Sequence, residues 1–187
     1  MLGISEKAAL LIIDVQNDFC PGGSLGVKDG DAIIPVINRL LALREGNHHF
    51  LVIASRDWHP QGTRHFEKWP QHCIAGTRGA EFHPDLKLPA DTIIVSKGQT
   101  EISDGYSAFD GGTADGRSLE QVLDDRNIEV LYIVGLATDY CVKETVIDSR
   151  AQKYARNVYL GAIRAVDMVP GDGQRAIDAM LASGANM

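Results

Sequence analysis

The stretch EVLYIVGLATDYCVKET, residues 129–145, decides the fold class that the sequence predicts. Its first part, EVLYIVGL (129–136), is an almost continuous apolar run of the length of a buried strand, and it leads directly into a helical pattern. A strand that is followed at once by a helix is the repeating unit of α/β proteins. Cys141 lies in the first turn of that helix, just beyond the strand, which is an unusual place for a cysteine in a soluble protein.

The same alternation recurs along the chain. We expect further strands at AALLIIDV (8–15), HHFLVIASRD (48–57), TIIVSK (92–97) and NVYLGAI (157–163). We expect helices at 31–46, 117–127 and 138–154 and within 171–185, with Ser118 capping the second and Gln121 completing a capping box. Apolar strands alternating with helices predict a doubly wound α/β sheet, mostly parallel, with helices on both faces. No linker is apparent, so residues 1–187 are expected to form a single domain.

Composition excludes several functions. The 187 residues are 44% hydrophobic and carry a net charge of −7, without the basic patch that a nucleic-acid partner requires. No apolar run is long enough for a signal peptide or a membrane span, so no membrane partner and a cytoplasmic location are expected. Three cysteines in a chain of this length do not form a disulfide framework, which leaves free thiols, metal ligands or a nucleophile.

Polar side chains stand where the expected strands end. Asp14 ends the first strand, Asp57 the second and Lys97 the third, and Cys141 follows the fourth. Long irregular segments, 57–91 and 98–116, also follow strands, and such connections are often functional. Because ligands of open α/β sheets bind beyond the carboxyl ends of the strands, we expect a site at this edge.

Cys141 is a candidate nucleophile. The unpaired N–H groups and positive dipole end of a helix favour a thiolate, and a nearby lysine favours it further. Asp14 is then a candidate general base, with Lys97 stabilising both anions. Each residue also has a structural interpretation: a buried free thiol, a turn-capping aspartate and a surface lysine.

The segment DWHPQGTRHFEKWPQHC (57–73) is a candidate metal site. Three imidazoles and a carboxylate suit Zn²⁺, Fe²⁺ or Mn²⁺, although loop histidines are also often only solvated. The candidate ligands are Asp57, His59, His65 and His72. Cys73 is the alternative ligand, but buried packing explains it better.

Apolar and aromatic residues flank these candidates and predict a pocket for a flat ring. They are Phe19, Leu25, Trp69, Tyr106 and Tyr140. Any one of them alone fits a core position equally well.

With these residues in view, the chain resembles the nicotinamidases (pyrazinamidases) of the isochorismatase-like cysteine hydrolase superfamily. The resemblance spans nearly the whole chain and rests on DVQNDFCPGGSL, SRDWHP, WPQHCIAGTRGAEFHP, SKG followed by YSAF, and GLATDYCV. It implies the isochorismatase-like hydrolase fold and hydrolysis of nicotinamide, and of pyrazinamide, through a cysteine thioester in the salvage of nicotinamide for NAD synthesis.

The resemblance also implies roles for individual residues. Asp14, Lys97 and Cys141 match the catalytic triad, and the Asp57 and histidine set matches ligands of one divalent metal, foremost Zn²⁺, that binds the pyridine nitrogen. A cis Leu136–Ala137 peptide and N–H groups of Ala137 and Cys141 match the oxyanion hole. Phe19, Leu25, Trp69, Tyr106, Ala137 and Tyr140 match the ring pocket.

Two departures and two rival functions remain. His65 matches the longer of two ligand spacings in the family, and some members carry His at the position of Tyr140.

One rival is a metal-independent amidohydrolase of N-carbamoyl or other small amides, which does not need the Asp57 and histidine set. The other is a metal-binding or thiol redox-sensor protein, although a redox pair needs a resolving cysteine near Cys141. The sequence leaves open which metal binds, whether the chain forms a homo-oligomer, and whether a C-terminal edge strand exists.

Overall fold

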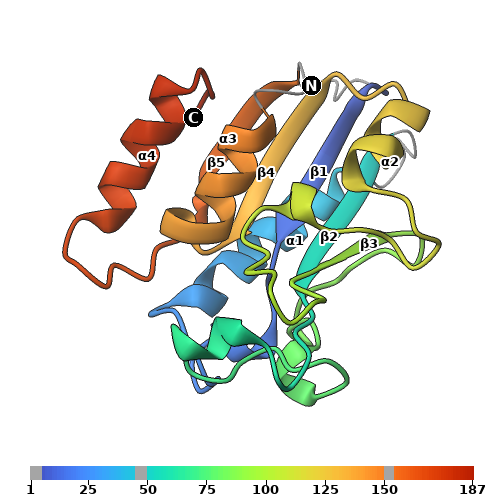
Figure 1. Cartoon of the computed structure of the whole chain (residues 1–187). Helices are drawn as coiled ribbons and strands as arrows, with labels where there is room; N and C mark the ends of the chain where they lie inside the picture. Colours follow the sequence, from blue (N-terminus) through green and yellow to red (C-terminus); the bar gives the residue numbers. More distant parts are fainter. Residues whose placement is uncertain (1–5, 45–49, 150–153) are drawn as a thin grey trace.

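Five parallel strands form one sheet in the order β3-β2-β1-β4-β5 (Figure 1). The computed structural model describes residues 6–44, 50–149 and 154–187. The strands are β1 Ala8–Ile13, β2 Leu51–Asp57, β3 Ile93–Lys97, β4 Val130–Leu136 and β5 Ala155–Arg164. The doubly wound parallel sheet that the sequence predicts is therefore confirmed.

Helices cover both faces of the sheet. They are α1 Ile34–Ala42, α2 Leu119–Asp125, α3 Lys143–Ser149 and α4 Asp172–Ala182. Side chains alternate along β1, so Leu10 and Ile12 pack with α1 on one face, while Leu11 and Ile13 pack with α2, α3 and α4 on the other. This two-sided burial explains why the strands read as continuous apolar runs.

The crossovers run in opposite directions from the middle of the sheet. β1 connects through α1 to β2 on one side, whereas β3 connects through α2 to β4 on the other side of β1. The strand order therefore reverses between β1 and β4, and the carboxyl ends of these two neighbours form the crevice where such sheets bind ligands. The long connection after β2 lies at this end of the sheet (Figure 1).

Element boundaries differ from the sequence prediction in informative ways. The first helix starts as a 3-10 turn, Gly30–Ile33, and the regular helix begins only at Ile34, with Pro35 in its first turn, where a missing N–H costs nothing. Strand β1 stops at Ile13 because Asp14 has a φ of 47°, which leaves the extended region. The ends of the predicted helices 31–46 and 138–154 and the start of the predicted strand 48–57 lie outside the described residues.

The capping box of α2 is confirmed. Ser118 Oγ accepts a hydrogen bond from Gln121 N at 3.2 Å, and Gln121 Oε1 accepts one from Ser118 N at 2.9 Å. These two bonds satisfy N–H groups that the first turn leaves without helical partners.

The C-terminus adds a bridge rather than a strand. Val158 N donates to Asn186 O and Asn186 N donates to Arg156 O, both at 2.8 Å, beside the edge strand β5. Within the described part of the chain, β5 is thus the last strand on that side of the sheet. None of the described helices is long and apolar enough to cross a membrane.

Gly135 allows β4 to approach β1 closely. Its φ is +119°, and a Cβ there would lie 2.0 Å from the backbone oxygen of Ile13. Gly135→Ala is therefore expected to lower the free energy of unfolding by about 4 kcal/mol or more, from backbone strain and overpacking together. Urea denaturation followed by circular dichroism measures the change.

Gly116→Ala is the matched control. Gly116 also has a positive φ, +87°, but nothing lies within 4 Å of a Cβ built there. Gly116→Ala should lower the free energy of unfolding by about 1–2 kcal/mol, from the strain of the left-handed conformation alone. Equal losses in the two variants would contradict the close approach at Gly135.

Candidate active site

Lys97, the last residue of β3, is the centre of a buried polar cluster. Its side chain is fully buried, and Nζ lies 2.8 Å from Asp14 Oδ2 and 3.5 Å from Cys141 Sγ. Nζ also donates hydrogen bonds to Asp57 Oδ1 and, at 2.7 Å, to Gly105 O. The structure therefore brings together the strand-end residues of β1, β2 and β3 and the cysteine that follows β4.

The charges in this cluster shift one another's pKa values. Burial alone would lower the pKa of Lys97, but the carboxylates of Asp14 and Asp57 outweigh it and hold the pKa well above its usual value. Burial opposes ionisation of Asp57 as well, yet Lys97 and His59 lower its pKa below the ordinary range. Lys97 and Asp57 thus remain a charged pair.

The pKa of Asp14 shifts in the opposite direction from that of Asp57. Burial raises its pKa, Lys97 only partly opposes this, and the neighbouring Asp57 raises it further. Ser55 Oγ donates to Asp14 Oδ1 at 2.7 Å. Oδ2 forms an ion pair with Lys97 Nζ at 2.8 Å. A carboxyl group of raised pKa beside a thiol can receive its proton.

Cys141 lies in a π-helical turn, Thr138–Val142, that precedes α3. Sequence analysis predicts a regular helix here, so the wider turn is a difference; such turns are frequent at functional sites. Burial raises the pKa of the thiol well above its ordinary value, with Lys97 opposing and Asp14 and Asp57 adding. The thiol, Asp14 and Asp57 offer atoms that lie within 4.8 Å of one another. The Leu136–Ala137 peptide that leads into the turn is cis.

Three histidines form a second buried cluster beside the first. His59, His65 and His72 offer ring nitrogens within 4.8 Å of one another. Each Nδ1 has an oxygen partner: Gly98 O at 3.0 Å, Asp104 Oδ1 at 2.8 Å and Pro70 O at 2.7 Å, respectively. A donated Nδ1–H leaves Nε2 as the ligand atom, which is the usual arrangement around a bound metal.

The donor chemistry of these histidines fits a divalent metal. Burial lowers the pKa values of His65 and His72, which favours the neutral rings that ligate metals. His59 Nε2 is fully buried and has no hydrogen-bond partner among the described residues, which is unfavourable unless something binds it. Three neutral imidazoles are a ligand set suited to Zn²⁺ or Fe²⁺.

Asp57 lies between the two clusters. One carboxylate oxygen binds Lys97, and the other, Oδ2, is 3.7 Å from His59 Nε2. The buried Gln16 holds its backbone in place, since Nε2 donates to Asp57 O and Oε1 accepts from Asp57 N, both at 2.8 Å. Gln16 is a supporting residue that sequence analysis missed, although it follows Asp14 by two positions.

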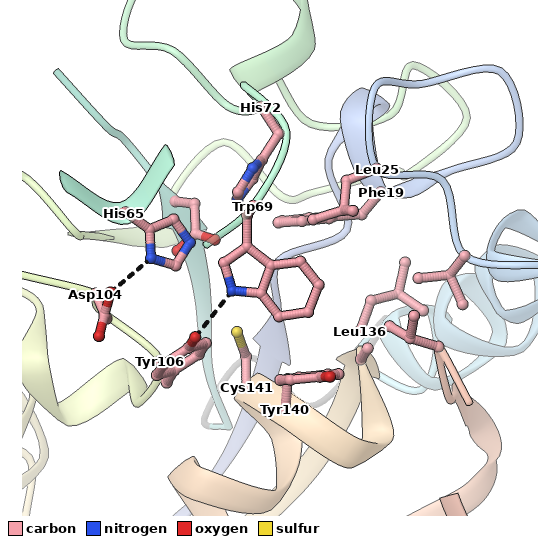
Figure 2. Close-up of a pocket in the computed structure, with 14 residues that line it drawn as sticks. Phe19, Leu25, His65, Trp69, His72, Asp104, Tyr106, Leu136, Tyr140 and Cys141 are labelled. Carbon is pink, nitrogen blue, oxygen red and sulfur yellow. Dashed lines mark hydrogen bonds and ion pairs between the residues drawn. The ribbon is translucent and has the colours of Figure 1, made fainter. Parts of the chain in front are cut away.

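A pocket opens above the thiol (Figure 2). Its walls include all six residues expected to form a ring pocket: Phe19, Leu25, Trp69, Tyr106, Ala137 and Tyr140. Trp69 Nε1 donates to Tyr106 Oη at 3.0 Å, and the rings of Tyr106 and Tyr140 stack with centroids 6.2 Å apart. Asp57, His65, His72 and Cys141 line the same pocket.

Sequence analysis missed four lining residues. They are Val27, Asp104, Leu136 and Val166. Leu136 could have been predicted, because it directly precedes Ala137 in the motif GLATDYCV. Val166 lies in the connection after β5, and no motif in the sequence there indicates a pocket residue.

Asp139 explains how Val166 reaches the pocket. The buried carboxylate accepts hydrogen bonds from Val166 N and Asp167 N, each at 2.9 Å. Asp167 in turn accepts from Gly173 N at 2.7 Å at the start of α4. Asp139 thus joins the turn that carries Cys141 to the segment that closes one wall of the pocket.

The other two cysteines are buried and free. Burial and Asp31 raise the pKa of Cys20 to about 11, and burial raises that of Cys73 still further. Cys73 Sγ has the backbone oxygen of Gly79 as its contact at 4.0 Å. Lys97 opposes the rise at Cys73, but burial and the nearby carboxylates outweigh it, so neither thiol is activated as a nucleophile.

The fold and this site define the class: an isochorismatase-like α/β domain with a cysteine at the carboxyl edge of its sheet. The chain belongs to the isochorismatase family, whose domain model matches residues 8–185. It is 39% identical to the nicotinamidase of Escherichia coli (strain K12), with 96% of this chain and 93% of that protein covered.

Solved structures agree with this family. The chain matches the zinc complex of Pyrococcus horikoshii pyrazinamidase with a TM-score of 0.87 and 35% identity, over 96% of this chain and 97% of that one. It matches PnC1 of L. infantum in complex with nicotinate with a TM-score of 0.84 and 30% identity, over 98% and 93% of the two chains.

Asp139→Asn tests the link between the thiol turn and the pocket wall. An amide keeps one acceptor and turns its NH₂ group toward the second backbone N–H, so we expect a loss of about 2 kcal/mol in the free energy of unfolding. Urea denaturation measures the loss. Asp178→Asn, an exposed change of the same kind on α4, should leave the midpoint unaltered; equal midpoints for both variants would argue against the link.

Proposed function

We propose that this chain is a nicotinamidase: an amidohydrolase that converts nicotinamide, and also pyrazinamide, to the carboxylic acid and ammonia. The observation that carries the proposal is one aromatic-walled pocket lined by Cys141 and by His65 and His72, two of the three clustered histidines. The E. coli nicotinamidase and the P. horikoshii pyrazinamidase, which this chain resembles over nearly its full length, support it.

Cys141 is the proposed nucleophile and Asp14 its general base. The raised pKa of the thiol means that the resting group holds its proton, so the proton must leave as Sγ attacks the carboxamide carbon. Asp14 is buried and one of its carboxylate oxygens lies within 4.8 Å of the thiol sulfur, which suits Asp14 to take this proton. Asp14 then returns the proton to the leaving amine, and ammonia departs.

The resulting thioester links the nicotinoyl group to Sγ. Water attacks its carbonyl carbon and Asp14 accepts a proton from that water. Cleavage of the C–S bond then releases nicotinate, and Asp14 returns the proton to Sγ, which restores the thiol. In both steps we assign the developing oxyanion to backbone N–H groups of Ala137 and Cys141. Lys97 supplies the positive charge that stabilises the thiolate and the carboxylate as the proton moves.

His59, His65 and His72, together with Asp57, are the proposed ligands of one divalent metal, foremost Zn²⁺ with Fe²⁺ and Mn²⁺ as alternatives. When bound, such a metal supplies a Lewis acid for the pyridine nitrogen. Phe19, Leu25, Trp69, Tyr106, Ala137 and Tyr140 are the proposed contacts of the ring. A flat aromatic substrate fits walls built from Trp69 and the stacked tyrosines.

The histidine cluster discriminates between the rival enzymes. An N-carbamoyl amidohydrolase needs the thiol, the lysine and Asp14, but it does not need three converging imidazoles, two of which line the pocket. We further propose that the chain is one domain, since all five described strands belong to one sheet. The cytoplasmic location and the homo-oligomer stay predictions from the sequence.

Ammonia release from nicotinamide is the direct test of the activity. Purified protein is assayed as isolated, after treatment with a chelator, and after re-addition of Zn²⁺, Fe²⁺ or Mn²⁺ separately. We expect release to fall with the chelator and to return with at least one metal, because the ring would lose and regain its anchor. Folded protein that releases no ammonia with any metal would exclude nicotinamide as the substrate, and N-carbamoyl amides would then be assayed.

Cys141→Ala tests the thioester. Without the nucleophile, kcat for nicotinamide should fall by at least about 1,000-fold. Cys20→Ala removes another buried thiol, outside the pocket, and should keep most of the activity. Mass spectrometry of the wild-type protein quenched during turnover should detect the acyl group on Cys141. Turnover by Cys141→Ala at the wild-type rate would eliminate this mechanism.

A further inference from the structure

The three histidines are oriented by chemically different partners. His59 and His72 have backbone oxygens, Gly98 O and Pro70 O, beside their Nδ1 atoms. His65 instead has a side chain, the carboxylate of Asp104, at 2.8 Å (Figure 2). Among the partners of the three Nδ1 atoms, Asp104 is therefore the one that carries a charge and that substitution can remove.

Asp104 is itself held at its other oxygen. Oδ2 accepts a hydrogen bond from Lys68 Nζ at 2.7 Å, and Lys68 lies three residues after His65 on the connection that carries the histidines. Lys68 and Asp104 therefore form an ion pair. One carboxylate thus spans a ligand and a cation of the same loop.

The backbone around Asp104 is fixed on the other side by the thiol cluster. Gly105 O accepts from Lys97 Nζ at 2.7 Å, and a Cβ on Gly105, whose φ is +63°, would lie 2.3 Å from Gly98 N. The next residue, Tyr106, accepts from Trp69 Nε1. The segment 104–106, here named the strap, therefore contacts the histidine cluster, the buried lysine and the pocket wall with three successive residues.

We propose that Asp104 is a positioning residue for the metal site: it fixes the ring of His65 so that Nε2 faces the other two histidines, and it thereby sets the affinity for the metal. The inference rests on the metal set of the proposed function. A charged acceptor on Nδ1–H selects the tautomer with a free Nε2 and makes that nitrogen a stronger donor. Removal of such a partner typically weakens metal binding by about 10- to 100-fold.

Zinc affinity, measured without substrate, tests the proposal. Zn²⁺ is titrated into metal-free wild-type, Asp104→Ala and Asp104→Asn protein in competition with a chromophoric chelator. We expect the dissociation constant to rise by about 10- to 100-fold in Asp104→Ala. Asp104→Asn keeps a neutral acceptor for Nδ1–H and should lie between the wild type and Asp104→Ala. At saturating zinc, kcat of Asp104→Ala should recover toward the wild-type value, because the ligands themselves remain.

Asp115→Ala is the matched control. Asp115 belongs to the same connection between β3 and α2 and is also ion-paired, with Arg117, and its hydrogen bonds are with Thr113 and Arg117 rather than with a histidine. Its removal deletes the same charge and should leave the dissociation constant for zinc unchanged. If both variants bound zinc equally weakly, the loss of affinity would be explained by the change in net charge alone, and the proposal would be overturned.

Two further results would also overturn it. One is an unchanged zinc affinity in Asp104→Ala, including the case in which only KM for nicotinamide rises, which would make Asp104 a substrate contact. The other is a lowered Tm with activity that excess zinc does not restore, which would indicate a merely structural role. Wild-type protein that binds zinc but does not hydrolyse nicotinamide would refute the proposed function, whereas the zinc affinities would still decide the role of Asp104.

Discussion

The burial of the Lys97 ammonium group is the constraint on which the rest of the site depends. A lysine removed from water is stable only if anions and hydrogen-bond acceptors surround it, and here Asp14, Asp57 and the carbonyl of Gly105 do so. Those partners come from the ends of β1 and β2 and from the loop after β3. The positive charge therefore holds three segments of the chain together at the same edge of the sheet where β4 delivers Cys141.

Asp57 makes the thiol cluster and the histidine cluster mutually dependent. Its carboxylate has one oxygen on Lys97 and the other facing His59 Nε2, so any cation drawn to the histidines shares this anion with the lysine. Gln16 holds the backbone of Asp57 between the two clusters through two hydrogen bonds. The position of Asp57 therefore decides how its negative charge is divided between Lys97 and the histidine cluster.

Much of this arrangement could be predicted from the sequence, because parallel strands bring their carboxyl ends to one edge. That rule alone places Asp14, Asp57, Lys97 and Cys141 together, and ligand chemistry adds His59, His65 and His72. The π-helical turn at Cys141 could not be predicted, since its residues suit a regular helix equally well. Val166 and Asp104 were also out of reach: each enters the pocket through a hydrogen bond to a residue more than 25 positions away, and no periodicity encodes such a contact.

The strap shows how a loop without regular structure can be as well determined as a strand. Residues 104–106 place a carboxylate, a carbonyl oxygen and a phenol against three different partners, and the glycine between the two side chains lets the backbone approach Gly98 more closely than any other residue would allow. A shift of the strap by one residue would break all three contacts at once. The loop after β3 is therefore well positioned although it has no regular structure. Lys97 holds Gly105, and the neighbouring Asp104 contacts the His65 ring, so the position of that ring depends on the buried lysine as well as on the histidine loop.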